Sequence, residues 1–310
     1  MPDSKVTLKQ FRYLVALADT GHFRQAAERC GISQPSLSVQ LQNLEGTLGL
    51  QLVERGRSGV FFTPAGREIA ERGRNVLMGV QDIVEFAQTA RHGIAGTIRL
   101  GVKPTLGPYL LPNVVKTLHR RHPDLKLYVR EGAPHELEHE LSQGVHDVIL
   151  AQLPVTQAGL ATERLFREPI YLAVAADHPL ARRREVTIKD LKGLPVLSLS
   201  PDYHLHDQVH ALCEDFGASM VRDYEGTSLD ALRQMVAMDM GATFVPALYA
   251  ASEIARGTDV VALPLKGRAI SRSIGLAWRK GTSRAAAYGD IAGVIRDIAR
   301  SDFRMLTLEK

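Results

Sequence analysis

The sequence predicts a multidomain chain: an N-terminal all-α winged helix-turn-helix, a long linker helix, and a C-terminal two-lobed α/β domain. Three observations support this. A leucine stripe follows a glycine turn near residue 31, a heptad-like apolar pattern runs through residues 69–87, and strands alternate with helices twice after residue 96. The expected boundaries are residues 1–62, 63–92 and 93–310, with a first lobe of 93–167 and 268–303 and a second of 168–267.

Composition excludes several classes of protein. The chain has 310 residues and is 45% hydrophobic, which is enough for two or three cores. Its two cysteines, Cys30 and Cys213, allow neither a disulfide framework nor a cysteine-rich zinc module. No secretory or membrane-spanning pattern is present, so we expect a cytoplasmic chain. Residues 1–67 hold eight Lys/Arg against five Asp/Glu, which favours an anionic partner for this region.

The segment 23–45, FRQAAERCGISQPSLSVQLQNLE, has the pattern of a helix-turn-helix. Ala26 and Ala27 allow two helices to approach closely, and Gly31 permits the turn. Ser33 is a suitable N-cap for a second helix. Leucines at 37, 41 and 44 give that helix one apolar stripe, so its other side is free to bind a ligand.

Small polar and amide side chains occupy this other side, and they suit base edges and phosphates in a major groove. The candidate DNA-contacting residues on the helix are Gln34, Pro35, Ser38, Val39 and Gln42. Arg55 and Arg57, in a glycine-containing turn, would form a wing whose contribution is electrostatic. The alternative is a small helical bundle with a solvated, glutamine-rich face.

One long helical pattern follows, with Thr63 as N-cap and Pro64 at its first position. The apolar residues Ile69, Val76, Val80, Ile83 and Ala87 follow a 7-4-3-4 spacing. At about 1.5 Å per residue such a rod is roughly 42 Å long, and a second copy of the helix could cover it. The alternative is that the helix packs along its own domain. This alternative stays open because Gly73 falls on the same side as these apolar residues and would weaken pairing with a second helix.

Two series of alternating strands and helices follow, which is typical of parallel βαβ units. In the first, strands TIRLGV and LKLYVR and the segment HDVILAQL enclose helices at 108–121 and 135–142. In the second, YLAVAA, PVLSLS, DYEGTS and ATFVPA accompany helices at 204–216 and 229–240. The strand SIGLAWR and a helix at 285–300 have no place in the second lobe, so we expect them to complete the first. Ligands bind such lobes at the carboxyl ends of the strands.

Residues 26–66, AAERCGISQPSLSVQLQNLEGTLGLQLVERGRSGVFFTPAG, resemble the DNA-binding domain of LysR-type transcriptional regulators. The resemblance covers essentially the whole chain. GVKPTLGPYLLP and EGTSLDALRQMVAMDMGATFVPA are similar to the OxyR-like branch, whose best-known members sense hydrogen peroxide. It implies a homodimer or homotetramer that binds double-stranded promoter DNA and carries a periplasmic-binding-protein-like effector domain. The family's DNA contacts then fall on Gln34, Pro35, Ser38, Val39 and Arg55, although Val39 replaces a longer polar residue and limits readout there to apolar contact.

Loops at strand ends and predicted helix N-termini supply the candidate effector site. These residues are Lys103, Pro104, Thr105, Leu106, His135, Gln152, Ser200, His204, Thr227, Ser228, Phe244 and Pro246. Hydroxyls at positions 105, 200 and 228 could hold a carboxylate, a water or a peroxide at a helix N-terminus. The alternative is that they only cap helices.

The segment SPDYHLHDQVHALCEDFG departs from the peroxide-sensing relatives. By the resemblance, His204 stands where they have a reactive cysteine, and Cys213 matches their resolving cysteine. Imidazole cannot replace a thiolate that attacks peroxide and is then trapped as a disulfide. We therefore expect no two-cysteine switch, and we interpret Cys213 as a buried structural thiol.

The same segment raises a metal-binding alternative, because His206, His210 and Cys213 follow i, i+4, i+7 spacing on one helix. A second i, i+4 histidine pair, His135 and His139, shows that the spacing also arises by chance. We expect no metal and no cofactor.

The expected function is thus a LysR-type transcriptional regulator that binds promoter DNA as an oligomer and responds to a small effector in the interlobe cleft. RNA polymerase is left open as a partner, and no membrane is expected. A redox- or metal-responsive regulator using Cys213 and its histidine neighbours is one alternative. A solute-binding protein is another, although the N-terminal region argues against it. Enzyme activity is not expected, because nucleophile-elbow, P-loop, dinucleotide-binding and zinc-protease motifs are absent from the sequence.

Overall fold

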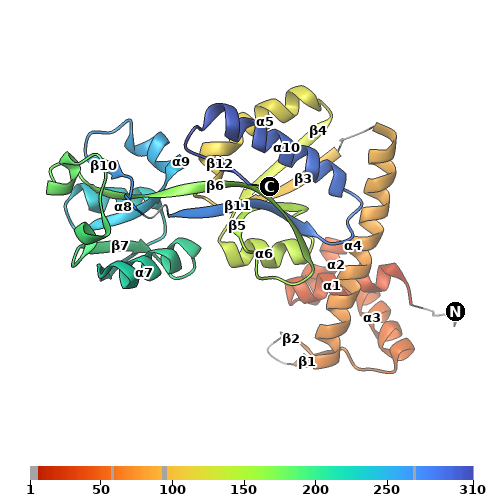
Figure 1. The fold of residues 1–310 in the computed structure, drawn as a ribbon. Coiled ribbons are helices and arrows are strands. Elements are labelled where there is room, and N and C mark those ends of the chain that lie inside the picture. The colour runs from red at the N-terminus through yellow and green to blue at the C-terminus, as the bar shows by residue number, and fades with distance from the viewer. Residues whose placement is uncertain (1–5, 57–58, 93–95, 268–269, 310) are drawn as a thin grey trace. The chain divides into compact units, whose positions relative to one another are not determined.

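A computed structural model describes residues 6–56, 59–92, 96–267 and 270–309 of the chain. Its contacts divide the chain into two compact units, Met1–Ala87 and Gln88–Lys310 (Figure 1). Each unit has its own hydrophobic core. The predicted combination of an α-helical N-terminal region and a two-lobed α/β region is confirmed.

Three helices and a hairpin precede the long helix in the first unit. They are α1 (Leu8–Thr20), α2 (Phe23–Cys30), α3 (Gln34–Leu48), β1 (Val53–Gly56) and β2 (Gly59–Phe62). A left-handed Gly31, with φ of 69°, makes the turn between α2 and α3, and the Ser33 hydroxyl caps α3. Ala26 and the leucine stripe of α3 are buried in one core, so the predicted helix-turn-helix packing is confirmed.

The long helix α4 (Pro64–His92) begins where the sequence predicts. Its N-cap is Thr63, whose Oγ1 accepts a hydrogen bond from the Gly66 N–H at 2.9 Å. Gly73 packs against α1, a role that the heptad-like spacing does not predict. A Cβ there would lie 2.9 Å from Cδ1 of Phe11 on α1, so glycine lets the two helices pack closely.

Beyond this contact four aliphatic residues of α4 are exposed in the single chain. The exposed fraction is 45% for Val76, 37% for Val80, 69% for Ile83 and 48% for Val84. Ile69, nearer the start of the helix, packs instead against the core of the first unit. A stripe of exposed aliphatic residues on a helix costs free energy in water, so this side of α4 is suited to a partner surface.

The described part of the second unit contains one ten-stranded sheet. Eight strands lie side by side in the order β4-β3-β5-β11-β6-β9-β7-β8, and β10 and β12 both pair with β6. The strands of the first lobe are β3 (Gly96–Val102), β4 (Leu125–Glu131), β5 (Val148–Leu153) and β11 (Ser271–Arg279). Those of the second lobe are β7 (Pro195–Leu199), β8 (Ser219–Gly226), β9 (Ala242–Pro246) and β10 (Val260–Leu263). β6 (Leu160–Ala175) belongs to both lobes, and β12 (Thr307–Leu308) joins its first half.

Helices cover both faces of the first lobe (Figure 1). α5 (Gly107–Arg121) and α10 (Ala285–Asp302) share one core with the sheet, and α6 (Pro134–Ser142) packs on the opposite face. β3 runs parallel to β4 and β5, as the alternation predicts. β11 and α10 return to this lobe, so that prediction is also confirmed.

The second lobe repeats the parallel arrangement, with β7 parallel to β8 and to β9. Its helices are α7 (His204–Phe216), α8 (Leu229–Ala237) and the three-residue α9 (Ala247–Tyr249). Short 3₁₀ segments lie at Pro179–Arg182 and Ile188–Leu191, and a π-helical turn lies at Ala250–Ile254. The predicted helix 229–240 is three residues too long, because the chain turns at Asp239, whose φ is 57°.

The length of β6 differs most from the sequence prediction. The sequence predicts only YLAVAA, but the strand spans 16 residues. Its first half pairs with β11 in the first lobe and its second half with β9 and β10 in the second. The connection between the two lobes therefore depends on β6 and its neighbour β11.

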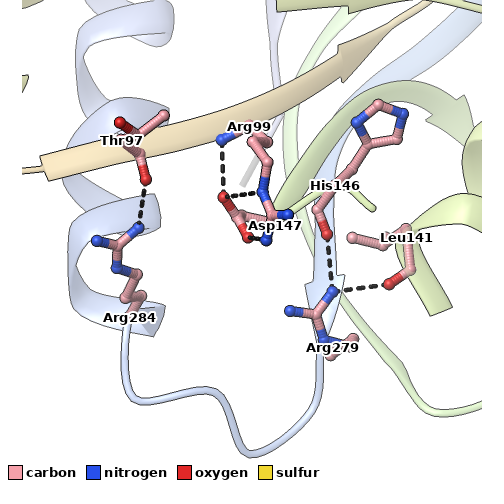
Figure 2. A network of polar contacts seen from close by, with 7 residues as sticks. All are labelled: Thr97, Arg99, Leu141, His146, Asp147, Arg279 and Arg284. Carbon is pink, nitrogen blue, oxygen red and sulfur yellow. Dashed lines mark hydrogen bonds and ion pairs between the residues drawn. The ribbon is translucent and has the colours of Figure 1, made fainter. Parts of the chain in front are cut away.

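A polar network joins the ends of several first-lobe elements (Figure 2). Asp147 is 4% exposed and accepts hydrogen bonds from the backbone N–H and the guanidinium of Arg99. Arg279 donates to the carbonyls of Leu141 and His146, and Arg284 donates to that of Thr97. These contacts satisfy carbonyl groups at the ends of α6 and near the start of β3.

The His146 ring of this network is also buried, and its Nε2 lies 2.9 Å from a Glu140 carboxylate oxygen. Burial lowers the pKa of His146, and the hydrogen bond to Glu140 opposes that effect only partly. The neutral ring is therefore favoured, with Nε2–H donating to Glu140.

Within the described ranges, no helix is both long and apolar enough to cross a membrane.

Candidate DNA-binding and effector sites

The exposed side of α3 carries the predicted DNA-contacting residues. Gln34, Pro35, Val39 and Gln42 are exposed and Ser38 is half-buried. Leu37, Leu41 and Leu44 are buried on the opposite side. Val39 is 52% exposed on the same side of the helix. The helix therefore presents amide groups and one apolar group to solvent together.

A carboxylate fixes the hairpin against this helix. Glu45 of α3 accepts hydrogen bonds from the backbone N–H groups of Leu52 at 2.7 Å and Val53 at 3.1 Å. The strand that leads to the predicted wing is thereby held to α3. Arg55 lies in β1 opposite Val60, but its side chain is outside the described residues, as is the whole of Arg57.

In the second unit, a buried ion pair joins the neighbouring antiparallel strands β6 and β11, in which Glu168 and Arg272 lie directly opposite each other. Arg272 Nε donates to Glu168 Oε2 at 2.8 Å, and both side chains are at most 1% exposed. The other guanidinium nitrogens donate to the Thr105 hydroxyl at 2.8 Å and to its carbonyl at 3.0 Å. The second oxygen of Glu168 accepts from the Leu248 backbone N–H at 2.9 Å.

The hydrogen bonds of this ion pair reach residues on both sides of the junction between the lobes. Thr105 follows β3 in the first lobe, and Leu248 follows β9 beside the second. Every charged atom that the contacts describe has a partner, which is the condition for burying charge without a large penalty. Thr105 is thus not a helix cap but an acceptor for Arg272.

Lys103 lies two residues before Thr105 and is only 2% exposed. Burial lowers the pKa of its amine to about 7, and the Arg272 charge lowers it further, whereas Glu138 and Glu168 act in the opposite direction. Near neutral pH the amine is therefore present in both protonation states. Such a group at the end of a parallel strand is a candidate for ligand binding.

Gln152 is the last residue but one of β5, beside the strand that leads to Lys103, and is 9% exposed. Its Oε1 is buried and has no hydrogen-bond partner within the described part of the chain. A buried oxygen left in this way costs about 1–3 kcal/mol, so a ligand that donates a hydrogen bond would be stabilised here.

The remaining predicted effector residues are placed differently. Thr227 is exposed, and the exposed Ser228 caps α8 by accepting from the Ala231 N–H at 3.2 Å, as the capping alternative expects. Ser200 is half-buried, and its backbone N–H donates to the Gly226 carbonyl. Pro104 is half-buried, His135 is exposed and Pro246 is buried. His204 begins α7, with its side chain outside the described residues.

Leu106 and Phe244 are both 0% exposed and belong to the cores of the first and second lobes. Phe244 lies in β9, which is buried at every position, as in a strand covered on both faces, and Leu106 is the N-cap residue of α5. We therefore correct their assignment from effector contacts to core residues.

The histidine and cysteine residues of α7 do not assemble into a metal site. Cys213 is 4% exposed within the second-lobe core, whereas His210 is exposed. The Nδ1 of His206 lies 2.8 Å from the Leu199 carbonyl oxygen. Among the described residues, no three His, Cys, Asp or Glu side chains form a group that could hold a metal ion. Burial also raises the pKa of the Cys213 thiol to about 11, so little thiolate forms near neutral pH.

Sequence reasoning missed Glu168 and Arg272. Both lie in segments where charged residues alternate with apolar ones, a pattern that normally places charges in solvent. The signal in the sequence is a glutamate on one strand and an arginine on another, which could pair across a sheet. This signal can be recognised only when the full length of β6 is known.

The helix-turn-helix and the two-lobed α/β unit together define a DNA-binding regulator with a ligand-binding domain. Residues 8–67 match the bacterial regulatory helix-turn-helix family of the lysR type, and residues 91–299 match the LysR substrate binding domain. The chain therefore belongs to the LysR family of transcriptional regulators.

Several OxyR proteins resemble the chain over nearly its full length. The DNA-binding transcriptional dual regulator OxyR of Escherichia coli is 38% identical over 297 residues, covering 96% of each chain. A probable hydrogen peroxide-inducible genes activator of Streptomyces viridosporus is 35% identical over 95% of each. A full-length OxyR cysteine-to-aspartate variant from Pseudomonas aeruginosa has a TM-score of 0.78 and 35% identity, covering 94% of this chain and 95% of that one.

The buried ion pair yields a stability prediction. Replacing Arg272 by Met leaves Glu168 charged and unpaired, and we expect a loss of about 3–5 kcal/mol in the free energy of unfolding. Combining Arg272→Met with Glu168→Leu should cost clearly less than the sum of the two single changes. Urea unfolding of the wild type and the three variants measures both quantities, and additive losses would contradict the coupling.

Proposed function

We propose that the exposed side of α3 binds promoter DNA in the major groove, with Arg55 and Arg57 contacting the adjacent backbone. The single observation that carries this proposal is the grouping of Gln34, Val39 and Gln42 on the side of α3 away from its buried leucines. Amide side chains pair with base edges, and an exposed valine can contact a thymine methyl group. The proposed division is a DNA-binding domain of residues 1–62, a linker helix of 63–92 and a regulatory domain of 93–310.

Matched substitutions test the assignment of these roles. Arg55→Ala should weaken binding to all DNA sequences and flatten the salt dependence, because it removes a charge contact. Gln34→Ala should mainly reduce the preference for the specific site, by about 1–3 kcal/mol of discrimination. Fluorescence anisotropy with a promoter fragment and a shuffled fragment of equal length, at several salt concentrations, measures both. Equal effects of Gln34→Ala on the two fragments would contradict base readout.

The exposed stripe of α4 supports self-association through the linker helix, as a homodimer that can assemble further into a homotetramer. Its members are aliphatic and 37–69% exposed, and they lie on a helix too long for one small domain to cover. Pairing would present two copies of α3 to the two halves of a partly palindromic site.

Val80→Asp should therefore dissociate the dimer, because it places a charge in an apolar seam. Asn75→Asp adds the same charge at an exposed polar position of α4 and should leave the assembly intact. Molar mass from light scattering distinguishes the variants. An unchanged mass for Val80→Asp would exclude the stripe as the interface.

We further propose that a small effector binds between the lobes, near Lys103 and Gln152. Support comes from the buried amine of Lys103 and the unpartnered Oε1 of Gln152. Pro104, Thr105, His135, Ser200, His204, Thr227, Ser228 and Pro246 complete the proposed surroundings. A ligand that favours one arrangement of the lobes would shift the oligomer and change the bend that it imposes on DNA.

We propose that this response proceeds without a two-cysteine peroxide switch. The chain has histidine at position 204, and Cys213 is buried with a raised thiol pKa. Hydrogen peroxide oxidises thiolates, so this thiol is a poor target.

Treatment with hydrogen peroxide should accordingly form no disulfide between Cys213 and Cys30 within one chain. Non-reducing peptide mass spectrometry detects such a bond, and DNA binding by wild type and Cys213→Ser should respond equally to peroxide. A peroxide response abolished by Cys213→Ser would overturn this part of the proposal and restore the redox-sensor alternative.

A further inference from the structure

A groove of about 450 Å³ lies along the first half of β6 and the end of β5 in the first lobe. Its apolar lining comes from Leu153, Val155 and Leu160, and its polar lining includes Arg164, Arg167 and Ser273. Neither Lys103 nor Gln152 lines it, so the groove is distinct from the proposed effector site. A mixed lining of this kind suits a ligand with one charged end and one apolar end.

A β-bulge in β6 brings the two arginines to the same face. Ile274 of β11 pairs with Phe166, but the next residue, Gly275, pairs with Arg164, so Leu165 is an extra residue in β6. Arg164 and Arg167 are both exposed, although they are three residues apart on a strand. In a regular strand, residues three apart face opposite sides.

Gly275 is required for this arrangement. A Cβ at that position would lie 2.6 Å from the Glu163 carbonyl oxygen and 2.6 Å from Cδ1 of Leu153. The bulged backbone and the apolar wall of the groove thus approach β11 as closely as glycine allows.

Two polar residues of the lining already bind a carboxylate of the chain itself. Glu309, next to β12, accepts a hydrogen bond from Arg167 Nε at 2.9 Å, and its other oxygen accepts from the Ser273 hydroxyl. Its backbone N–H donates to the Leu165 carbonyl at 3.0 Å, and its side chain is only 10% exposed. One half of the polar lining is therefore shaped to bind a carboxylate.

The other half carries an unmatched positive charge. Within the ranges that the structure describes, the Arg164 guanidinium has no acidic partner and makes no side-chain hydrogen bond. The opposite wall is fixed because the buried Glu138 accepts hydrogen bonds from the Thr156 and Gln157 backbone N–H groups. The lining contains two arginines and no acidic residue, and Glu309 outside the lining pairs with Arg167.

We propose that this groove binds a small organic monocarboxylate, with the carboxylate on Arg164 and a short apolar body against Leu153, Val155 and Leu160. Guanidinium and carboxylate form a charge-assisted, two-point contact, and the apolar wall adds buried area. Arg167 and Ser273 adjoin Glu168 and Arg272 in sequence. A bound carboxylate therefore lies against the strands that carry the interlobe ion pair, on the opposite face of the sheet.

The proposal is tested on the full-length protein with hexanoate and benzoate as probes, and with hexanamide and benzamide as neutral analogues of the same shape. Isothermal titration calorimetry should show the carboxylates binding about tenfold or more tightly than the amides. Arg164→Gln should lose that preference, and Arg164→Lys should keep part of it. Arg182→Gln, which removes an exposed arginine from the second lobe, should bind like the wild type.

A second variant tests the role of the tail. Glu309→Gln removes the negative charge beside Arg167, so the affinity for the carboxylates should rise severalfold. Unfolding temperatures confirm that each variant is folded. The proposal is overturned if the amides bind as tightly as the carboxylates, if Arg164→Gln binds like the wild type, or if neither carboxylate binds at millimolar concentration. Loss of carboxylate binding on Lys103→Met with Arg164→Gln unaffected would instead locate the ligand at the proposed effector site.

Discussion

The Glu168–Arg272 pair is the interaction on which the architecture of the second unit depends. It is fully buried between the paired strands β6 and β11, and its remaining hydrogen bonds reach Thr105 in the first lobe and Leu248 beside the second. Isolated charges at this depth would be prohibitively costly, so the two strands, the loop after β3 and the start of α9 must be in place together. This requirement makes the junction of the lobes specific as well as stable.

Much of the fold follows from local signals in the sequence. Thr63 with Pro64, Ser33, and the leucine stripe of α3 predict helix starts and faces because capping and periodicity act over a few residues. The full length of β6 could not be predicted in this way. Its first half alternates charged and apolar residues and includes a bulge at Leu165, so its pairing depends on β11, more than 100 residues later in the sequence.

The candidate sites differ in how far sequence could define them. The face of α3 follows from helical geometry alone. The effector residues were inferred from strand ends, which does not reveal which side chains point inward, and so Leu106 and Phe244 were assigned to a surface that they do not reach. Glu168 and Arg272 were overlooked for the opposite reason, because charged residues are expected in solvent and only a partner across the sheet brings them inside.

Similarity to OxyR proteins and the chemistry at Cys213 lead to different expectations about the signal, and the local chemistry should decide between them. A fold can keep its lobes, crossing strands and DNA-binding helix while the reacting groups change, because these features depend on packing and not on a thiolate. At position 204 the chain has an imidazole, and Cys213 is part of a hydrophobic core. The second unit has a buried amine at Lys103 whose pKa is lowered to about 7, an unpartnered amide oxygen at Gln152 and polar surfaces lined by arginine. These groups can recognise charged or hydrogen-bonding ligands reversibly, which is the mode of sensing that the effector proposal requires.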